Sequence, residues 1–453
     1  MKKRTASKLA YSPNFGSFFR PESFRFFYGY LILFWGTLGV WLSIPGQTMG
    51  ISVFTDPVKG ALGLSRDEFS NAYTIGTILS ALFVARAGRW FDRIGARYLA
   101  MIASFSMAIL LLIFSWSEQI ITLISNYTSL TKWWITFLLV TSLFFGLRFF
   151  GQGVLTMSSR NMIMMWFERY RGRVNMITSI ALSFGFSSAP LWMNSMIDNW
   201  GWSGAWQVMS LCLLVFTFLI LLFYRVRPED HGLLPDGISA PSSEKKHAFI
   251  KPVIEFTLSE ARSTRAFWVF SILLAFNSFF ITGLTFHVVS IFESFGLNKE
   301  QAVWVFLPGS VVAVMVSTIF NYFSDYAKLK GYAYMMIFGG LVACFGLAQL
   351  DRPYAIYLLI GGMGTLSGFF GVLNSVTWPR FYGRKHLGAI TGKVMSFLVF
   401  SSAIAPTLFS YSYTHFGSYV YAAYFGILVL VILALAARGA NNPQEFIEST
   451  TTP

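Results

Sequence analysis

Residues 88–97 read GRWFDRIGAR and lie between two apolar runs, each about 20 residues long. A helix needs about 20 apolar residues to cross the hydrocarbon core of a bilayer, so each run can form one membrane-spanning helix. Between them, Gly88 permits close helix approach and Gly95 permits a tight turn. Asp92 carries a carboxylate that can accept hydrogen bonds from an arginine or from the N-terminus of a facing helix. The segment therefore predicts a tight turn between two transmembrane helices.

Composition favours the membrane over water as the solvent of this chain. Of the 453 residues, 55% are hydrophobic and only 12% are charged, whereas a soluble domain has about 25% charged residues. So few charges cannot cover a water-exposed surface. The sequence therefore predicts an all-α membrane protein with twelve transmembrane helices, near residues 26–50, 69–87, 98–116, 133–157, 174–197, 203–224, 266–292, 301–323, 332–350, 354–378, 388–412 and 418–437.

The distribution of basic residues predicts the orientation. With the N-terminus inside, 28 of the 34 Lys and Arg residues fall in inside segments and five in outside loops, and the remaining one is Arg148. Basic residues are enriched on the cytoplasmic side of membrane proteins. We therefore expect a multi-pass protein of the cytoplasmic membrane with both termini in the cytoplasm. The same asymmetry accounts for the net charge of +14, so no nucleic-acid partner is expected.

The two halves of the chain repeat one another. Segments 63–97 and 296–330 align at a shift of 233 residues, and segments 172–201 and 388–417 align at a shift of 216. An insertion in the loop at 117–132 accounts for the difference. The fold class predicted is therefore two pseudo-symmetric six-helix bundles. A duplicated bundle around a midplane site is the architecture of alternating access, in which one half rocks against the other.

A polar stretch separates the two halves and defines the domains. It begins RVRPEDHGLLPDG at residue 225 and is rich in Pro, Gly and charge, as linkers are. The expected order is a cytoplasmic tail, a six-helix bundle, a cytoplasmic linker, a second bundle and a second cytoplasmic tail. Their predicted ranges are 1–25, 26–224, 225–265, 266–437 and 438–453.

The stretch at 88–97 resembles the G-x-x-x-D-R-x-G-x-R signature of the major facilitator superfamily at every defined position. The resemblance implies the twelve-helix major facilitator fold and a transport function. The copy in the second half, 321–330, keeps the aspartate but neither glycine. The alternative is a plain cluster of charges at the membrane surface. The residues expected to pack and gate the two halves are Gly88, Asp92, Arg93, Gly95, Arg97 and Asp325.

Arg148 is a charged residue in the middle of a predicted span. Residues 147–153, LRFFGQG, resemble the second motif of the same superfamily, R-x-x-x-G-x-G. An arginine cannot lose its proton in a protein, so its charge must face the bundle interior, a water-filled cavity or a partner. The sequence places no Asp or Glu near the membrane centre to pair with it. Arg148 is therefore predicted either to face an anionic substrate or to bond helix carbonyl groups.

Further candidate substrate-binding groups come from two stretches with helix-breaking character. Residues 44–50, IPGQTMG, contain Pro and Gly, which bend or break helices. Residues 282–287, TGLTFH, occupy the matching place in the second half. Discontinuous helices in corresponding places point to the binding site of a transporter. The candidates are Gln47, Thr48, Thr285 and His287, joined by Gln152 and Asn374 on neighbouring spans. His287 either titrates during transport or is a neutral packing residue.

Lys393 lies about one and a half turns inside the eleventh predicted span. It either points into the cavity as a cytoplasmic gate or extends to the cytoplasmic surface, and the second reading is favoured.

Four more segments are similar to the monocarboxylate porter and oxalate/formate antiporter branch of the superfamily. They are WFERYRG at 166–172, RPEDHGL at 227–233, AFW at 266–268 and GRKHLG at 383–388. This resemblance implies a small carboxylate substrate, moved with protons or in exchange. Two features depart from the branch: residues 301–323 carry no arginine, and Lys393 lies shallower than the lysine of oxalate carriers. These departures leave the substrate open between a different organic anion and a solute that is not an anion.

Other function classes are less consistent with the sequence. An exporter of amphipathic compounds or a sugar carrier is the alternative transporter, although sugar symporters usually use a membrane-embedded carboxylate that is missing here. An enzyme would need a catalytic motif, and a membrane sensor would add an output domain; the sequence has neither. The expected partners are a small-molecule substrate, protons as a candidate co-substrate and the lipid bilayer, with the protein working as a monomer. No cofactor or metal is expected.

Overall fold

The computed structural model of the protein describes residues 20–237 and 254–445. The rest of the predicted tails and linker lies outside the described residues. The first half contains α1 (Gly29–Trp41), α2 (Thr48–Leu62), α3 (Arg66–Ser115), α4 (Ser117–Tyr127), α5 (Lys132–Leu147), α6 (Thr156–Trp166) and α7 (Arg171–Phe223). The second half contains α8 (Leu258–Ser263), α9 (Arg265–Ser294), α10 (Lys299–Trp304), α11 (Phe306–Ser324), α12 (Leu329–Ala348), α13 (Ala355–Tyr382), α14 (Leu387–Phe416) and α15 (Val420–Ala437).

The prediction of twelve spans is confirmed once two very long helices are each divided. Ten helical stretches in the described part of the chain are long and apolar enough to cross a membrane, and two of them hold 49 and 53 residues. At 1.5 Å per residue these two would be more than twice as long as a bilayer core is thick. Each contains one glycine with a non-helical backbone, Gly95 in α3 (φ 79°) and Gly201 in α7 (φ 68°). Each glycine turns the chain back, so each stretch forms two spans.

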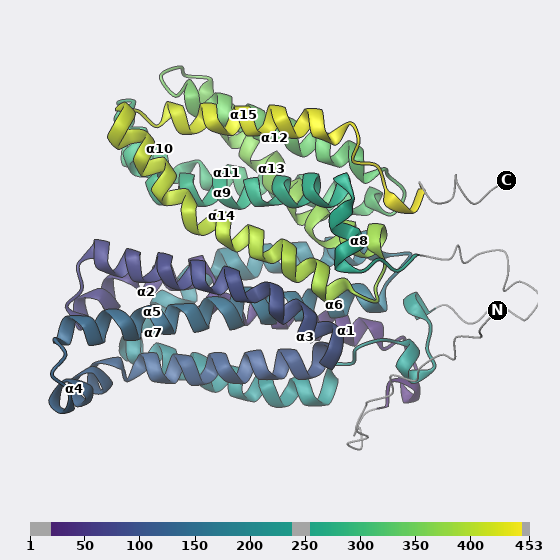
Figure 1. Ribbon diagram of the computed structural model, residues 1–453, viewed down its shortest axis with the longest axis horizontal. Coiled ribbons are helices and arrows are strands. Elements are labelled where there is room, and N and C mark those ends of the chain that lie inside the picture. Colours follow the sequence, from purple (N-terminus) through teal and green to yellow (C-terminus); the bar gives the residue numbers. More distant parts are fainter. Residues whose placement is uncertain (1–19, 238–253, 446–453) are drawn as a thin grey trace, which may run out of the picture.

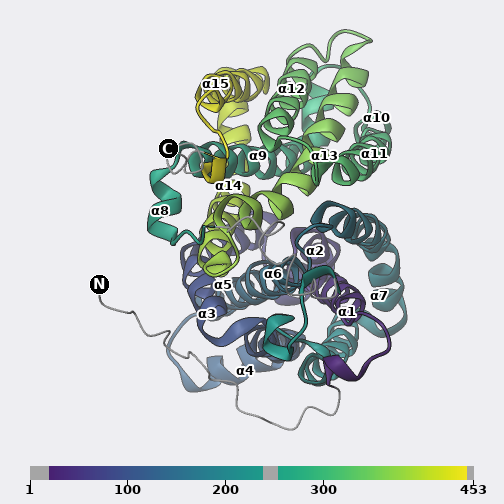
Figure 2. The same cartoon turned by 90° about the vertical axis from the view of Figure 1, so that its right-hand side faces the viewer.

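The spans form two bundles (Figure 1). Helices α1 to α7 make one bundle and α9 to α15 the other, and Figure 2 shows the two side by side when viewed along the helices. The bundles meet where α3 packs against α14 and α11 against α7. We call the end of the molecule with the turn at Gly95 and the starts of α7 and α14 the motif end, and the other end the opposite end.

The predicted break in the first span is present, and the matching break in the seventh is not. Residues Ile44–Gly46 form a 3-10 turn between α1 and α2, and Gln47 is extended (φ −92°, ψ 159°). In contrast, α9 is one continuous α-helix through Gly283. The prediction of a break there was wrong. A side chain at Gly283 would overlap the ring of Phe409, so this glycine serves close packing, and no proline interrupts the helix.

The two halves contact each other at the motif end and separate toward the opposite end. In the described part of the chain, hydrogen bonds between the two bundles lie in the half nearer the motif end and include those joining Asn161 to Thr391, Asn175 to Asn321 and Ser396 to Ala81. On α11, Asn321 is 0% exposed. Leu307 lies 14 residues earlier, on nearly the same helix face, and is 71% exposed. That face of α11 therefore loses its contact with α7 toward the opposite end.

Candidate functional site

Arg148 is fully buried at the centre of the first bundle. Its Nη1 donates to the carbonyl oxygen of Gly46 (3.4 Å) and to Oγ1 of Thr48 (3.2 Å). Its guanidinium carbon lies 5.4 Å from the centre of the Tyr73 ring, which gives a cation–π contact. Within the described residues, Nε and Nη2 have no hydrogen-bond partner and no acidic side chain pairs with the arginine. One edge of a buried guanidinium is therefore unpaired.

The backbone around Arg148 is not an ordinary α-helix. Residues Arg148–Leu155 form a π-helical segment between α5 and α6. Such segments are rare and often occur at functional sites. A Cβ atom added at Gly46 would come within 2.8 Å of the Gly151 Cα, so the broken first span and the π-helical segment touch at two glycines. This close approach brings Thr48 within reach of Arg148.

The other predicted polar groups of the first bundle lie around this contact. Gln47 donates through Nε2 to Ser43 (3.0 Å) and to Thr156 (3.1 Å). The hydroxyl of Thr48 also bonds the hydroxyl of Tyr73 (2.9 Å). Gln152 is half-buried, and its Oε1 is enclosed without a hydrogen-bond partner among the described residues. The first bundle therefore brings together four of the seven predicted binding residues: Gln47, Thr48, Arg148 and Gln152.

The three candidates of the second bundle are not joined to this group. Thr285 is exposed and bonds the carbonyl of its own helix at Ile281 (2.7 Å). His287 lies 2.9 Å, through Nε2, from the carbonyl oxygen of Pro406, which can only accept, so Nε2 carries the proton of this bond. Asn374 is half-buried on α13. No hydrogen bond links any of the three to Arg148 in the described part of the chain.

The two predicted gating aspartates cap helices of the opposite bundle. The oxygens of Asp92 accept from the backbone N–H groups of Gly388 (2.8 Å) and Ala389 (2.7 Å), at the N-terminus of α14. Asp325 accepts from the N–H of Gly172 (2.6 Å), at the N-terminus of α7. A carboxylate at a helix N-terminus satisfies free N–H groups and faces the positive end of the helix dipole. Each bundle thus caps one helix of the other.

The remaining residues of the 88–97 motif have separate positions. A Cβ at Gly88 would overlap the carbonyl oxygen of Gly388, so this glycine lets α3 and α14 touch. Gly95 adopts a positive φ at the turn. Arg97 donates to the carbonyl oxygen of Leu221 within its own bundle, and Arg93 is exposed. The motif therefore contributes to packing in one bundle and to contacts between the two.

Lys393 is half-buried on α14, with its Nζ 4.7 Å from the centre of the Phe397 ring. At this distance the ammonium group of Lys393 makes a cation–π contact with the Phe397 ring.

Several polar residues of the site were not predicted from the sequence. Tyr73 contacts both Thr48 and Arg148, but a tyrosine within an apolar run carries no signal of its own. Arg384, in the second bundle, donates to the carbonyl oxygen of Met165 in the first bundle (2.6 Å) and to Glu229 in the linker (2.7 Å), although its segment was noted only for a family resemblance. In the linker, burial raises the pKa of the Asp230 carboxyl group. Burial lowers the pKa of the His231 imidazole, and the positive charge of Arg225 lowers it further.

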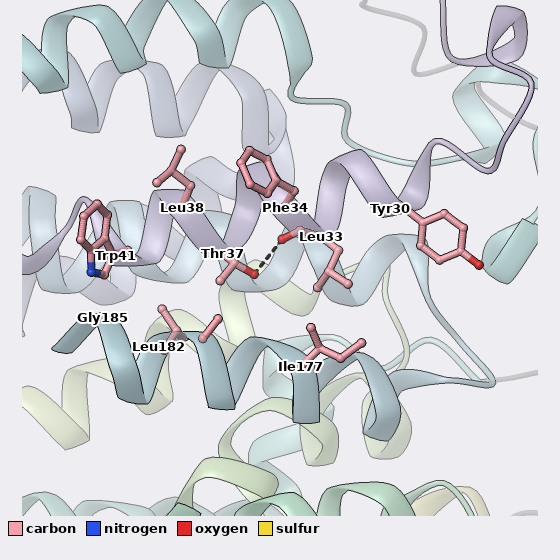
Figure 3. A pocket seen from close by; sticks show the side chains of 10 residues that line it. Tyr30, Leu33, Phe34, Thr37, Leu38, Trp41, Ile177, Leu182 and Gly185 are labelled. Atoms are coloured by element: carbon pink, nitrogen blue, oxygen red, sulfur yellow. Dashed lines mark hydrogen bonds between the residues drawn. The ribbon is translucent and has the colours of Figure 1, made fainter. Parts of the chain in front are cut away.

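An apolar cavity lies elsewhere in the first bundle, between α1 and α7 (Figure 3). It has a volume of about 390 Å³. None of the predicted site residues lines it, and its lining carries no charged side chain, so it has no counter-charge for an anion. Its lining residues are Tyr30, Leu33, Phe34, Thr37, Leu38, Trp41, Ile177, Ala181, Leu182 and Gly185.

Three comparisons place the chain among known proteins. No curated protein sequence matches it. Among solved structures it is similar to the proton:xylose symporter XylE (15% identity, TM-score 0.61, 92% of this chain and 98% of that one). It is also similar to the fucose:proton symporter FucP of E. coli (12% identity, TM-score 0.57, 90% of this chain and 97% of that one). A third similar structure is the human organic anion transporter MFSD10 (13% identity, TM-score 0.58, 91% of this chain and 99% of that one). At these low identities, the structural similarity shows a shared fold alone. The family model described as Major Facilitator Superfamily matches residues 26–406, and with most of the chain covered, this protein belongs to the Major Facilitator Superfamily.

Proposed function

We propose that this protein is a secondary active transporter that moves a small organic anion, such as a carboxylate, across the cytoplasmic membrane by alternating access. Members of its family are membrane transporters rather than enzymes. In this proposal the two bundles, residues 26–224 and 266–437, rock about the central site. The motif end faces the cytoplasm together with both termini, and the protein works as a monomer. Transport is coupled to protons or proceeds by anion exchange, as in the monocarboxylate and oxalate/formate branch.

The unpaired edge of Arg148 carries the substrate proposal. Nη1 is already used by Gly46 and Thr48, whereas Nε and Nη2 have no partner among the described residues. Their N–H groups lie in the guanidinium plane, point in parallel from one edge and match the two oxygens of a carboxylate. In a low-dielectric bundle an unpaired positive charge is costly, and an anionic substrate would supply the missing counter-charge.

Two neighbours would orient this edge. Tyr73 makes a cation–π contact with the guanidinium, and its hydroxyl bonds Thr48, which in turn accepts from Nη1. The guanidinium is therefore held by the Tyr73 ring and by the hydrogen bonds of Nη1. Nε and Nη2 are also enclosed by protein in this state, so a substrate reaches them only when neighbouring side chains move. Gln152, about one helical turn away, has an enclosed oxygen without a partner and is a candidate for that movement.

A binding screen with two variants of one residue tests the proposal. Purified protein is screened by thermal shift against small carboxylates, sugars and hydrophobic cations, and Kd is measured for the best ligand. Removing one partner of a buried charge pair costs about 2 to 5 kcal/mol, so Arg148→Gln is expected to weaken carboxylate binding at least about 30-fold. Arg148→Lys keeps the charge but not the parallel N–H groups, so its Kd is expected to lie between the two.

Arg160 provides a matched control on the same span. It lies 12 residues closer to the motif end, which is about 18 Å along a helix. Arg160→Gln removes the same charge and is expected to leave the Kd unchanged. If Arg148→Gln binds a carboxylate as tightly as the parent, the anion proposal is wrong. Stabilisation by sugars alone would favour the sugar-carrier alternative.

A further inference from the structure

The cavity between α1 and α7 is a groove that opens toward the membrane. At its rim, Tyr30 and Phe34 of α1 are 61% and 59% exposed, and Ile177 of α7 is 52% exposed. These residues lie in the half nearer the motif end, where the two bundles are in contact, and Figure 2 shows α1 at the outer edge of its bundle, set away from the second bundle. Their exposed faces therefore point to the surroundings of the protein, which in a bilayer are hydrocarbon.

The groove is about as long as one membrane leaflet is deep. It extends along α1 from Tyr30, near the motif end, to Trp41, whose ring packs over Gly185 and closes it. From residue 30 to residue 41 a helix rises about 16 Å, and half of the hydrocarbon core of a bilayer is about 15 Å thick. The hydroxyl of Thr37 donates to the carbonyl oxygen of Leu33 (2.7 Å), as Figure 3 shows. With this hydroxyl already bonded, the walls suit a hydrocarbon chain.

The second bundle shows that the fold does not require this groove. At the repeat shift of 216, Ala181 in the groove corresponds to Phe397 on α14. The Phe397 ring lies 5.8 Å from the ring of Trp268 on α9, the helix equivalent to α1. Between α9 and α14, an aromatic side chain thus occupies the place that Ala181 leaves open between α1 and α7.

An open groove of about 390 Å³ must be filled within a membrane. A void forfeits the dispersion contacts of its walls, and the hydrocarbon core holds no water to fill it. The acyl chain of a neighbouring lipid is the available filler. Because lipid tails are as apolar as the walls, the groove itself does not select one lipid over another, and any selection comes from the headgroup.

Two arginines lie at the mouth of the groove. The Phe27 ring lies 5.8 Å from the ring of Tyr30, at the rim, and 5.7 Å from the ring of Phe167. Arg25 lies two residues before Phe27 and is exposed. Arg169 lies two residues after Phe167 and is exposed as well. The aromatic contacts therefore place both cations near the rim.

Arg173 adds a third cation, one helical turn before Ile177 of the rim. The guanidinium groups of Arg169 and Arg173 lie 5.6 Å and 5.1 Å from the centre of the Tyr170 ring. Among the described residues, none of the three arginines pairs with a carboxylate. The nearby carboxylate of Asp236 accepts from backbone N–H groups of the loop that contains Arg169. The mouth thus presents three arginines without a counter-charge.

We infer that this groove is a binding site for an anionic phospholipid of the leaflet at the motif end. One acyl chain lies between α1 and α7, and the phosphate lies among Arg25, Arg169 and Arg173. The groove determines where the chain lies, and the arginines determine which headgroup is preferred. This inference does not depend on the substrate that the protein carries.

Photo-crosslinking with two lipid probes tests the inference. The protein is reconstituted in phosphatidylcholine vesicles with a trace of phosphatidylglycerol or of phosphatidylcholine, each carrying the same photoreactive acyl chain. Labelled peptides are identified by mass spectrometry, and label is expected in residues 30–41 and 177–185. Each basic residue near an anionic lipid contributes a preference of about fivefold. With two or more arginines engaged, the phosphatidylglycerol probe is expected to label the groove at least about 25-fold more than the phosphatidylcholine probe.

Variants of the mouth and of the groove test the two parts separately. Arg169→Gln and Arg173→Gln are each expected to lower the ratio of the two labels by about fivefold. Arg89→Gln, which removes an exposed arginine of α3 at the motif end, is expected to leave the ratio unchanged. Ala181→Phe fills the groove as in the second bundle and is expected to abolish groove labelling by both probes. Ala436→Phe, at an exposed position of α15, is expected to retain it.

Three results would overturn the inference: equal labelling by the two probes, an equal fall of the ratio in Arg89→Gln and Arg169→Gln, or parent-like groove labelling in Ala181→Phe. Thermal unfolding in detergent checks that each variant folds, and Ala181→Leu replaces Ala181→Phe if that variant does not. Arg148→Gln is expected to leave lipid labelling unchanged, so a failure of this inference and a failure of the anion proposal are distinguishable.

Discussion

Replacing Asp92 by asparagine is expected to shift the protein strongly toward the state open at the motif end. The carboxylate accepts two backbone hydrogen bonds, from Gly388 at 2.8 Å and Ala389 at 2.7 Å, and it does so only while α3 and α14 are in contact. Hydrogen bonds to charged groups contribute about 1.5 to 3 kcal/mol each, against about 0.5 to 1.5 for neutral ones. Asparagine keeps one accepting oxygen and presents an N–H₂ group to the second donor.

One bond is lost and the other becomes a neutral bond, so the sum of these losses is about 2.5 to 4.5 kcal/mol, which corresponds to a shift of about 70- to 2,000-fold in the ratio of open to closed states. A ligand-independent shift of this size should also slow uptake in proteoliposomes, because the cycle needs both states. Spin labels at Asn126→Cys and Tyr354→Cys, exposed at the opposite end, report the rocking without touching the mutated contact.

Two other carboxylates serve as comparisons for Asp92. Asp325 accepts one backbone hydrogen bond from the opposite bundle, so Asp325→Asn is expected to shift the same ratio by only about tenfold. Asp67 is exposed at the opposite end, and Asp67→Asn is expected to have no effect. If Asp92→Asn leaves the distance distribution and the uptake rate of the parent unchanged, the cap on α14 does not stabilise the closed state and the reasoning fails.

Three further perturbations follow from the fold. Gly88→Ala places a methyl group against the carbonyl of Gly388, so we expect slower uptake with unchanged membrane insertion; normal uptake would show that α3 and α14 tolerate separation there. If uptake depends on pH, His287→Gln should remove most of that dependence, and an unaltered pH profile would assign the proton to the substrate or exclude proton coupling. A membrane-impermeant thiol reagent should label Asn126→Cys in intact cells and Lys328→Cys only after permeabilisation; the reverse pattern would invert the orientation.

Local sequence patterns predicted the number of spans, one turn and one helix break correctly, because the determinant of each is local. The apolar runs predict twelve spans because length and hydrophobicity alone decide whether a helix can cross a bilayer. Gly95 predicted the turn between two spans because a positive φ favours glycine. Pro45 and Gly46 predicted the break in the first span, because proline removes a backbone donor.

The interruption expected at Gly283 shows where such patterns are ambiguous. A glycine in an apolar run can mark a break or a close contact, and both leave the same trace in the sequence. Here the ring of Phe409, more than 100 residues away, occupies the space that a side chain would need. Without a neighbouring proline the helix continues, and only the packing of α14 on α9 shows what the glycine is for.

The sequence by itself determined the membrane class, the number of spans, the repeat and the presence of an arginine near the middle of the fourth span. Only the tertiary structure decided what surrounds that arginine: a π-helical segment, a tyrosine ring in cation–π contact and an edge without a partner among the described residues. It also revealed that Arg384 joins both bundles to the linker. The physical reason is that hydrophobicity and backbone preference act over a few neighbouring residues, whereas hydrogen-bond partners are chosen by how distant helices pack, which depends on the whole chain at once.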